Sequence, residues 1–319
     1  MKNSPENLSK RIPNESLPNI EAEKKPRYII MITRHAERLP SGELSPEGVT
    51  HAKAKGERLK NVEVLKSYAS DHPSGRTYET AENIGSEADV KSPQTGERYK
   101  TMRVKGIQYD VLKPTILKDA KLLIEEATLE EISREHPELM QSINSALAED
   151  KGGALTKVNS RGETMADIEK LPKDIQRKIA PIRQKNQKFG FERILNNSEA
   201  TQNMAAGLSH QIFNKELLLG RYAKSREKKE KSPKKDVVIN LNTHGLFTES
   251  LLKNAGIFIR PDGEEIHGID NMDSDELGGY IQPAESIYLD IGSDPNNIPE
   301  RIPIFFEGER DVKGKIYID

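Results

Sequence analysis

A run of apolar residues near the N-terminus ends abruptly in an arginine and a histidine. Residues Tyr28–Glu37 read YIIMITRHAE. A run of this length, rich in isoleucine and bounded by charge, predicts a strand that is buried on both faces within a parallel sheet. Ligands of open α/β sheets bind outside the carboxyl ends of the strands, which makes Arg34 and His35 candidates for a ligand site. Taken alone, an Arg-His pair more commonly just ends a strand.

The composition limits the classes of protein that remain. The chain has 319 residues, of which 34% are hydrophobic and 31% are charged. No apolar run approaches the roughly 18 residues that span a bilayer, so we expect no contact with a membrane. The chain has no cysteine, which excludes disulfides, thiolate metal ligands and cysteine nucleophiles and fits a cytoplasmic protein. A net charge of -2 gives no reason to expect nucleic-acid binding. The oligomeric state remains open.

The chain divides by composition into a tail and one large domain. Residues 1–26 are polar, with scattered prolines and without the apolar block of a secretory signal, and we expect a disordered tail there. Residues 27–319 form the domain. Within it, an apolar stripe and helix-start signals predict a helical insertion or cap over about 128–219. The basic run at about 221–235 predicts an exposed loop, with docking of an anionic partner as the alternative.

Two further segments repeat the strand-to-loop pattern. Val62–Ser70 ends in a loop that contains Pro and Gly, and Arg76 lies where this loop enters the next helix. Residues 236–244, DVVINLNTH, form an apolar run that ends in His244, and a helix follows it. Because the carboxyl ends of parallel strands meet at one edge of a sheet, Arg34, His35, Arg76 and His244 are expected to face one crevice.

These four side chains suit a phosphate ester. Guanidinium groups match the oxygens of a phosphate in a bidentate fashion and are permanently charged. A neutral imidazole in line with the phosphorus can attack it, while the second histidine and both arginines stabilise the charge that develops. This set needs neither a metal nor another cofactor. A histidine metal site is the weaker alternative, because the arginines would repel a cation and no HxxxH or HxH spacing occurs.

The motifs together resemble the histidine phosphatase superfamily, which has the phosphoglycerate mutase-like fold. They are TRHAE at 33–37, LSPEG at 44–48, SGRT with ETAE at 74–82, and THG at 243–245. The resemblance covers about 27–85 and 236–256. It implies an α/β fold with a mixed, mostly parallel sheet that is flanked by helices on both faces. It also implies that His35 becomes phosphohistidine, and that Arg34, Arg76 and His244 form the phosphate pocket.

The resemblance further implies a carboxylic acid that protonates the leaving oxygen. The best match to the family's acidic segment is ILKD at 116–119, which makes Asp119 the first candidate, with Glu125 and Glu126 as substitutes. All three also fit solvated surface carboxylates. Burial beside the leaving group would raise the pKa of such an acid.

Three more residues near the predicted crevice are candidates for binding substrate. Glu37 and Arg38 follow the nucleophile, although an exposed salt bridge explains them equally well. His72 lies in the loop before Arg76.

The sequence therefore predicts a metal-independent phosphatase that hydrolyses a small phosphomonoester through phosphohistidine on His35. Phosphoglycerate mutase-type transfer is an alternative within the same fold, although no clamp of adjacent arginines for a substrate carboxylate is visible after Gly85. A catalytically idle module that binds a phosphorylated ligand in the same pocket is the alternative from another class. The sequence does not identify the substrate.

Overall fold

A computed structural model describes most of the chain outside its N-terminal segment. The residues that it describes are 25–38, 43–70, 75–88, 101–107, 111–159, 161–229, 232–269, 281–307, 312 and 314–319, with only the backbone of Leu65. The expected disordered tail lies outside these residues as far as residue 24. His72 also lies outside them.

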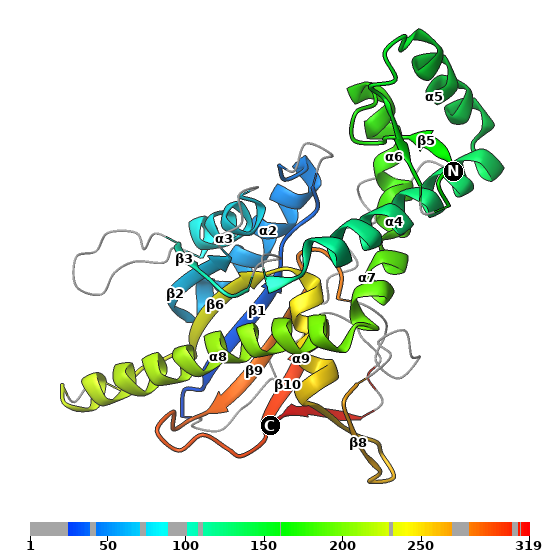
Figure 1. Cartoon of the computed structure of the whole chain (residues 1–319). Coiled ribbons are helices and arrows are strands. Elements are labelled where there is room, and N and C mark those ends of the chain that lie inside the picture. Colours follow the sequence, from blue (N-terminus) through cyan, green and yellow to red (C-terminus); the bar gives the residue numbers. More distant parts are fainter. Residues whose placement is uncertain are drawn as a thin grey trace.

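A mixed sheet forms the centre of the molecule (Figure 1). In the described part of the chain it has nine strands, in the order β3 (Met102–Val104), β2 (Glu63–Ser70), β6 (Val237–Thr243), β1 (Tyr28–Arg34), β9 (Ser286–Gly292), β10 (Ile302–Phe306), β11 (Lys315–Ile318), β7 (Gly256–Ile259) and β8 (Glu265–His267). The strand predicted at Tyr28 is therefore central, as its continuous burial requires.

The strands on the two sides of β1 pair differently. β3, β2, β6 and β1 are parallel neighbours. From β1 onward, every described neighbour in the order β9, β10, β11, β7, β8 is antiparallel to the one before it. Because this direction alternates, β10 and β7 run the same way as β1. The expected mixed sheet is confirmed, with parallel pairing confined to the half that carries the candidate residues.

Helices cover both faces of the sheet, as expected. Alternate residues of β1 point to opposite faces. Ile30 packs in one core with side chains of α8 (Ser198–Glu227) and α9 (Gly245–Ala255). Met31 packs in another core with side chains of α2 (Pro46–Arg58) and α3 (Arg76–Glu87). The short 3-10 helix Leu59–Asn61 follows α2.

A helical insertion projects from this core. It contains α4 (Pro114–Glu135), α5 (Pro137–Glu149), the hairpin of β4 (Thr156–Val158) with β5 (Thr164–Ala166), α6 (Lys173–Lys185) and α7 (Gln187–Leu195). Figure 1 shows α5 and α6 at the upper right, away from the sheet. Ile132, Ile143 and Ile179 belong to a separate apolar cluster there, so the insertion has its own small core. We call residues 114–195 the cap.

The cap differs from the expected segment at both ends. Its first helix begins at Pro114 rather than near Thr128, because proline is favoured at the first helical position, where no N–H is needed. The segment up to residue 219 includes most of α8, which packs on the sheet instead of in the cap. The expected basic loop also begins later than residue 221, since α8 continues to Glu227. None of the described helices is long and apolar enough to cross a membrane.

Candidate active site

The two histidines lie side by side because their strands are parallel neighbours. In the register of β1 with β6, Arg34 lies opposite Thr243. The residue that follows each strand is a histidine, so the register brings His35 and His244 together. The His35 N–H donates to the carbonyl of Thr243 at 2.9 Å. The ring centroids of His35 and His244 are 5.1 Å apart, with 73° between the ring planes. The predicted meeting of the two strand-end histidines is thus found.

Arg76 reaches the same place from the next strand. It is the first residue of α3, and Gly75 before it adopts a φ of 70°, a conformation that glycine enters without strain. Nη2 of Arg76 donates to Nδ1 of His244 at 3.2 Å. Thr80, one turn further along α3, accepts a hydrogen bond from the Ala36 N–H at 3.1 Å. The ETAE motif therefore ties α3 to the loop after β1.

Arg34 is held by contacts from distant parts of the chain. Its guanidinium donates to the carbonyl of Ile281 and, at 3.1 Å, to Oε1 of Gln187. The ring of Phe191 lies 5.4 Å from the guanidinium carbon. A Cβ on Gly245 would come within 2.9 Å of Cδ of Arg34, which explains the glycine after His244. Arg34, His35, Arg76 and His244 are all buried, with exposed fractions of 6%, 8%, 6% and 0%.

The hydrogen bonds assign opposite tautomers to the two neutral rings. A carbonyl oxygen only accepts, so His35 donates from Nδ1 to the oxygen of Ala36 at 2.8 Å, and its Nε2 carries the lone pair. An arginine only donates, so His244 accepts at Nδ1 and carries its proton on Nε2. Burial, with the charges of Arg76 and Arg34, holds the pKa of His35 well below its ordinary value. His35 is therefore neutral near pH 7, in the form that can act as a nucleophile.

A cleft opens at the carboxyl end of β1, between the sheet and the cap. One wall is the segment from Arg34 to Arg38. The facing residues come mainly from α6 and the start of α7. The remaining lining residues are Ile168, Gln176, Ile179, Ala180, Arg183, Gln184, Gln187 and Pro283. His35 thus lies in a cleft that the cap completes.

Glu37 and Arg38, both predicted near the substrate, line this cleft. Both carboxylate oxygens of Glu37 contact Nδ1 of His51, at 3.0 and 3.1 Å. The hydrogen bond to Glu37 raises the pKa of His51. The backbone of Glu37 is also fixed, because its carbonyl accepts from the Ser45 N–H at 2.9 Å and a Cβ on Gly48 would approach the same oxygen to 2.3 Å. The LSPEG motif therefore shapes the cleft through Glu37.

The structure does not bring Asp119 to the cleft, and this corrects its choice as first candidate for the acid. Asp119 lies within α4, its side chain is 54% exposed, and it pairs with Arg193 at 3.8 Å. The displacement follows from the start of α4 at Pro114, which places 116–119 inside a helix instead of in a loop before one. Glu125 is fully buried and contacts Lys157 and Arg183 instead of lining the cleft. Glu126 does not line the cleft either.

Several lining residues were not predicted from the sequence. Arg183, Gln184 and Gln187 belong to a part of the chain for which only cap helices were expected. The lining residues of α6 share one face through their spacing of three and four, but nothing local indicates that this face lies across the cleft from the end of β1. His51, on α2, is a further residue that was not predicted at the site, and it holds Glu37.

One group of donors in the described residues has the spacing for a metal ion, and it lies in the cap. It consists of Glu131, Glu135 and His136. Glu131 there already accepts hydrogen bonds from Lys185 at 2.7 Å and from Asn186 at 2.9 Å. These contacts account for the buried carboxylate as part of the packing between α4 and α6. The spacing of these three residues is therefore explained without a bound metal ion.

A scan against protein-family models and a search of curated proteins gave no match. Solved structures that resemble the chain include a phytase from Klebsiella sp. ASR1, with 14% identity, a TM-score of 0.40, and coverage of 92% of this chain and 87% of that one. A multiple inositol polyphosphate phosphatase from Bifidobacterium longum has 9% identity and a TM-score of 0.45, with 93% and 90% coverage. A mycobacterial glucosyl-3-phosphoglycerate phosphatase has 12% identity and a TM-score of 0.32, with 89% and 98% coverage. The resemblance to histidine phosphatases itself rests on the four sequence motifs. Of their residues, Arg34 and His35 line the cleft, whereas His244 lies beside the His35 ring and Arg76 donates to His244 without either lining it.

Proposed function

We propose that this protein is a phosphatase that hydrolyses a small phosphomonoester through a phosphohistidine on His35. The observation that carries the proposal is the convergence of Arg34, His35, Arg76 and His244 at the carboxyl ends of three parallel strands. The buried, neutral His35 is suited to attack, and Arg34, Arg76 and His244 are the donors that we propose to bind the phosphate.

In the first step, Nε2 of His35 attacks the phosphorus, and the ester P–O bond breaks. The guanidiniums of Arg34 and Arg76 and the Nε2–H of His244 bind the equatorial oxygens, where negative charge collects. In the second step, water attacks the phosphohistidine, the P–N bond breaks, and inorganic phosphate leaves. His35 returns to its neutral form, so each turnover ends with the alcohol, phosphate and unchanged enzyme.

The leaving oxygen needs a proton, and Glu37 is the carboxyl group that supplies it. Among the described residues that line the cleft, Glu37 is the one with a carboxyl group. It passes a proton from His51 to the leaving alcohol and takes one from the attacking water in the second step, as microscopic reversibility requires. His51 holds the carboxyl group in place and reaches solvent, with 41% of its side chain exposed. Protons can therefore return to Glu37 from outside.

The test is hydrolysis of a panel of phosphomonoesters in the presence of a metal chelator. We expect His35→Ala to lower kcat/KM by at least about 1,000-fold, because the covalent route is lost. The matched control is His210→Ala, which removes an exposed histidine of α8 and should leave activity unchanged.

Undiminished hydrolysis by His35→Ala would refute the proposal. Tight binding of phosphate without turnover by the wild-type protein would instead identify a binding module. Formation of 2-phosphoglycerate from 3-phosphoglycerate would identify a mutase.

A further inference from the structure

The wall of the cleft that faces His35 carries a charged residue which the proposed chemistry does not use. Gln176, Ile179, Ala180, Arg183 and Gln184 recur at intervals of three and four along α6 and line the cleft together. Residues with this spacing share one face of a helix. Arg183 is the cationic group of this face, and the reacting phosphate already has Arg34, Arg76 and His244.

Two carboxylates hold Arg183 in place. Its Nη2 lies 3.0 Å from Oε1 of Glu169 and 3.7 Å from Oε1 of Glu125, which is fully buried in α4. Although burial acts in the opposite direction, the hydrogen bonds and charges of Lys121 and Arg183 lower the pKa of Glu169. Glu169 is therefore ionised near pH 7 and fixes the direction of the guanidinium. A guanidinium has five N–H donors, so an anion can be bound while Nη2 stays with its carboxylates.

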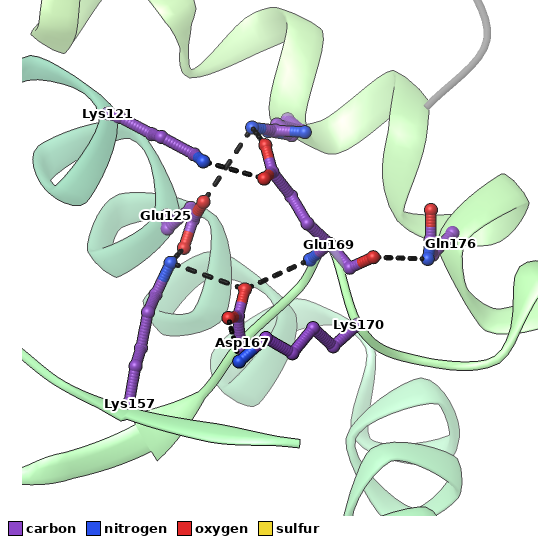
Figure 2. A network of polar contacts seen from close by, with 8 residues as sticks. Lys121, Glu125, Lys157, Asp167, Glu169, Lys170 and Gln176 are labelled. Atoms are coloured by element: carbon purple, nitrogen blue, oxygen red, sulfur yellow. Dashed lines mark hydrogen bonds and ion pairs between the residues drawn. The ribbon is translucent and has the colours of Figure 1, made fainter. Parts of the chain in front are cut away.

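These carboxylates do not cancel the charge of Arg183, because other cations share them. Figure 2 shows Lys121 and Lys157 converging on Glu169 and Glu125, with Lys157 and Lys170 also at Asp167. The connected group is Lys121, Lys157, Lys170 and Arg183 with Glu125, Asp167 and Glu169. It therefore contains one more basic than acidic side chain, and its net charge is +1.

The rest of the lining agrees with an anion at this wall. Arg38 adds a second cation on the β1 side, while the side chains of Gln184 and Gln187 add amide groups. Glu37 is the acidic lining residue among those described, and it is engaged by His51. A ligand whose only anionic group is the reacting phosphoryl group would offer Arg183 no anion to bind in the cleft.

We infer that Arg183 recognises a second anionic group on the substrate, either a carboxylate or another phosphate, away from the phosphoryl group that reacts. This inference rests on the proposed phosphatase function. Glu169 and Glu125 then act as positioning residues, since they orient the guanidinium without touching the substrate. The preferred substrates are small phosphomonoesters that carry at least one further negative charge.

The test compares kcat/KM for phenyl phosphate with values for aryl phosphates that carry a carboxylate or a second phosphate at the meta or para position. Aryl leaving groups need little protonation, so the test does not depend on Glu37. We expect wild-type protein to prefer at least one of the doubly anionic esters by about 10- to 100-fold, the value of a charge-assisted hydrogen bond. The arms with carboxylate and with phosphate separate the two sources of negative charge.

Arg183→Gln should abolish this preference, so that kcat/KM for the doubly anionic esters falls by about 10- to 100-fold relative to that for phenyl phosphate. Hydrolysis of phenyl phosphate by the variant also shows that it folds. Arg183→Lys, which keeps a charge beside Glu125, should retain part of the preference. The matched control is Arg177→Gln, at an exposed position of the same helix, and it should behave as wild type.

Wild-type protein without a preference for any doubly anionic ester would overturn the inference, as would a preference that survives in Arg183→Gln. If Arg183→Gln loses activity toward every ester and unfolds in a thermal melt, the inference is tested by Arg183→Lys and the wild-type protein instead. A full preference for doubly anionic esters in Arg183→Lys would then overturn it. Failure of the wild-type protein to hydrolyse phenyl phosphate or any other ester would contradict the proposed function itself. The two failures are therefore distinguishable.

Discussion

One hydrogen bond to each of two neighbouring histidines, at the ends of β1 and β6, gives their rings different tautomers. His35 donates from Nδ1 to a carbonyl, whereas His244 accepts at Nδ1 from Arg76. In their neutral forms, one ring therefore offers a lone pair at Nε2 and the other offers an N–H at the same atom. In the proposed mechanism, the nucleophile and the donor are therefore set before a phosphate arrives, and such preorganisation lowers a barrier.

The effect of removing the carboxyl group of Glu37 on kcat/KM is expected to depend on the leaving group of the ester. Glu37→Gln keeps a side chain that can accept from His51 but has no proton to transfer to an alcohol. We expect kcat/KM for alkyl phosphates to fall by about 100-fold or more, and that for aryl phosphates to change much less, because aryl oxides leave without protonation. Steady-state kinetics on one alkyl and one aryl ester measure the difference.

Glu47→Gln is the matched control, since Glu47 is an exposed acid in the first turn of α2. It should leave both classes of ester unaffected. An equal loss for alkyl and aryl esters in Glu37→Gln would assign the proton donor to another carboxyl group.

At the scale of elements, the sequence predicts the strands and helix starts that local signals mark. The apolar runs at β1 and β6 place Arg34, His35 and His244, and Ser45 caps α2 with its hydroxyl accepting from the Gly48 N–H. The prediction of Asp119 as the acid was wrong because α4 begins at Pro114, so that Asp119 lies inside a helix with its side chain exposed. The position of α6 across the cleft from the end of β1 has no local signal, so the place of Arg183 and its proposed role depend on the fold of the whole chain.

The first residue of α7 contacts Arg34, which is proposed to bind phosphate, from the cap. Gln187 accepts from Nη2 of Arg34, and Gln187→Leu removes that acceptor while keeping a similar volume. A lost hydrogen bond to a charged group costs about 1.5–3 kcal/mol, so we expect inhibition by vanadate to weaken by about 10-fold or more. Inhibition constants from steady-state kinetics give this value.

Gln202→Leu, at an exposed position of α8, is the control and should not alter inhibition by vanadate. Unchanged inhibition in Gln187→Leu would mean that the carbonyl of Ile281 and the ring of Phe191 suffice to hold Arg34.

At the scale of the whole molecule, the residues proposed for chemistry and those proposed for recognition lie in different parts of the fold. The parallel half of the sheet brings together the residues proposed to bind and attack the phosphoryl group, and the antiparallel half continues the sheet on the other side of β1. The cap, inserted between β3 and α8, adds the opposite wall of the cleft and its own charge. Substitutions in the cap are therefore expected to change substrate choice, while substitutions at the ends of β1, β2 and β6 change turnover.

The most direct measurement is the covalent state of His35 during turnover. The protein is mixed with an aryl phosphate, denatured in alkali, where phosphohistidine survives, and analysed by mass spectrometry of the peptide that contains Tyr28–Glu37. We predict a phosphoryl group on His35 that is lost in acid and is absent from His35→Ala. Rapid turnover with no phosphoryl group on His35 at any time, or a phosphoryl group on another residue, would contradict the account.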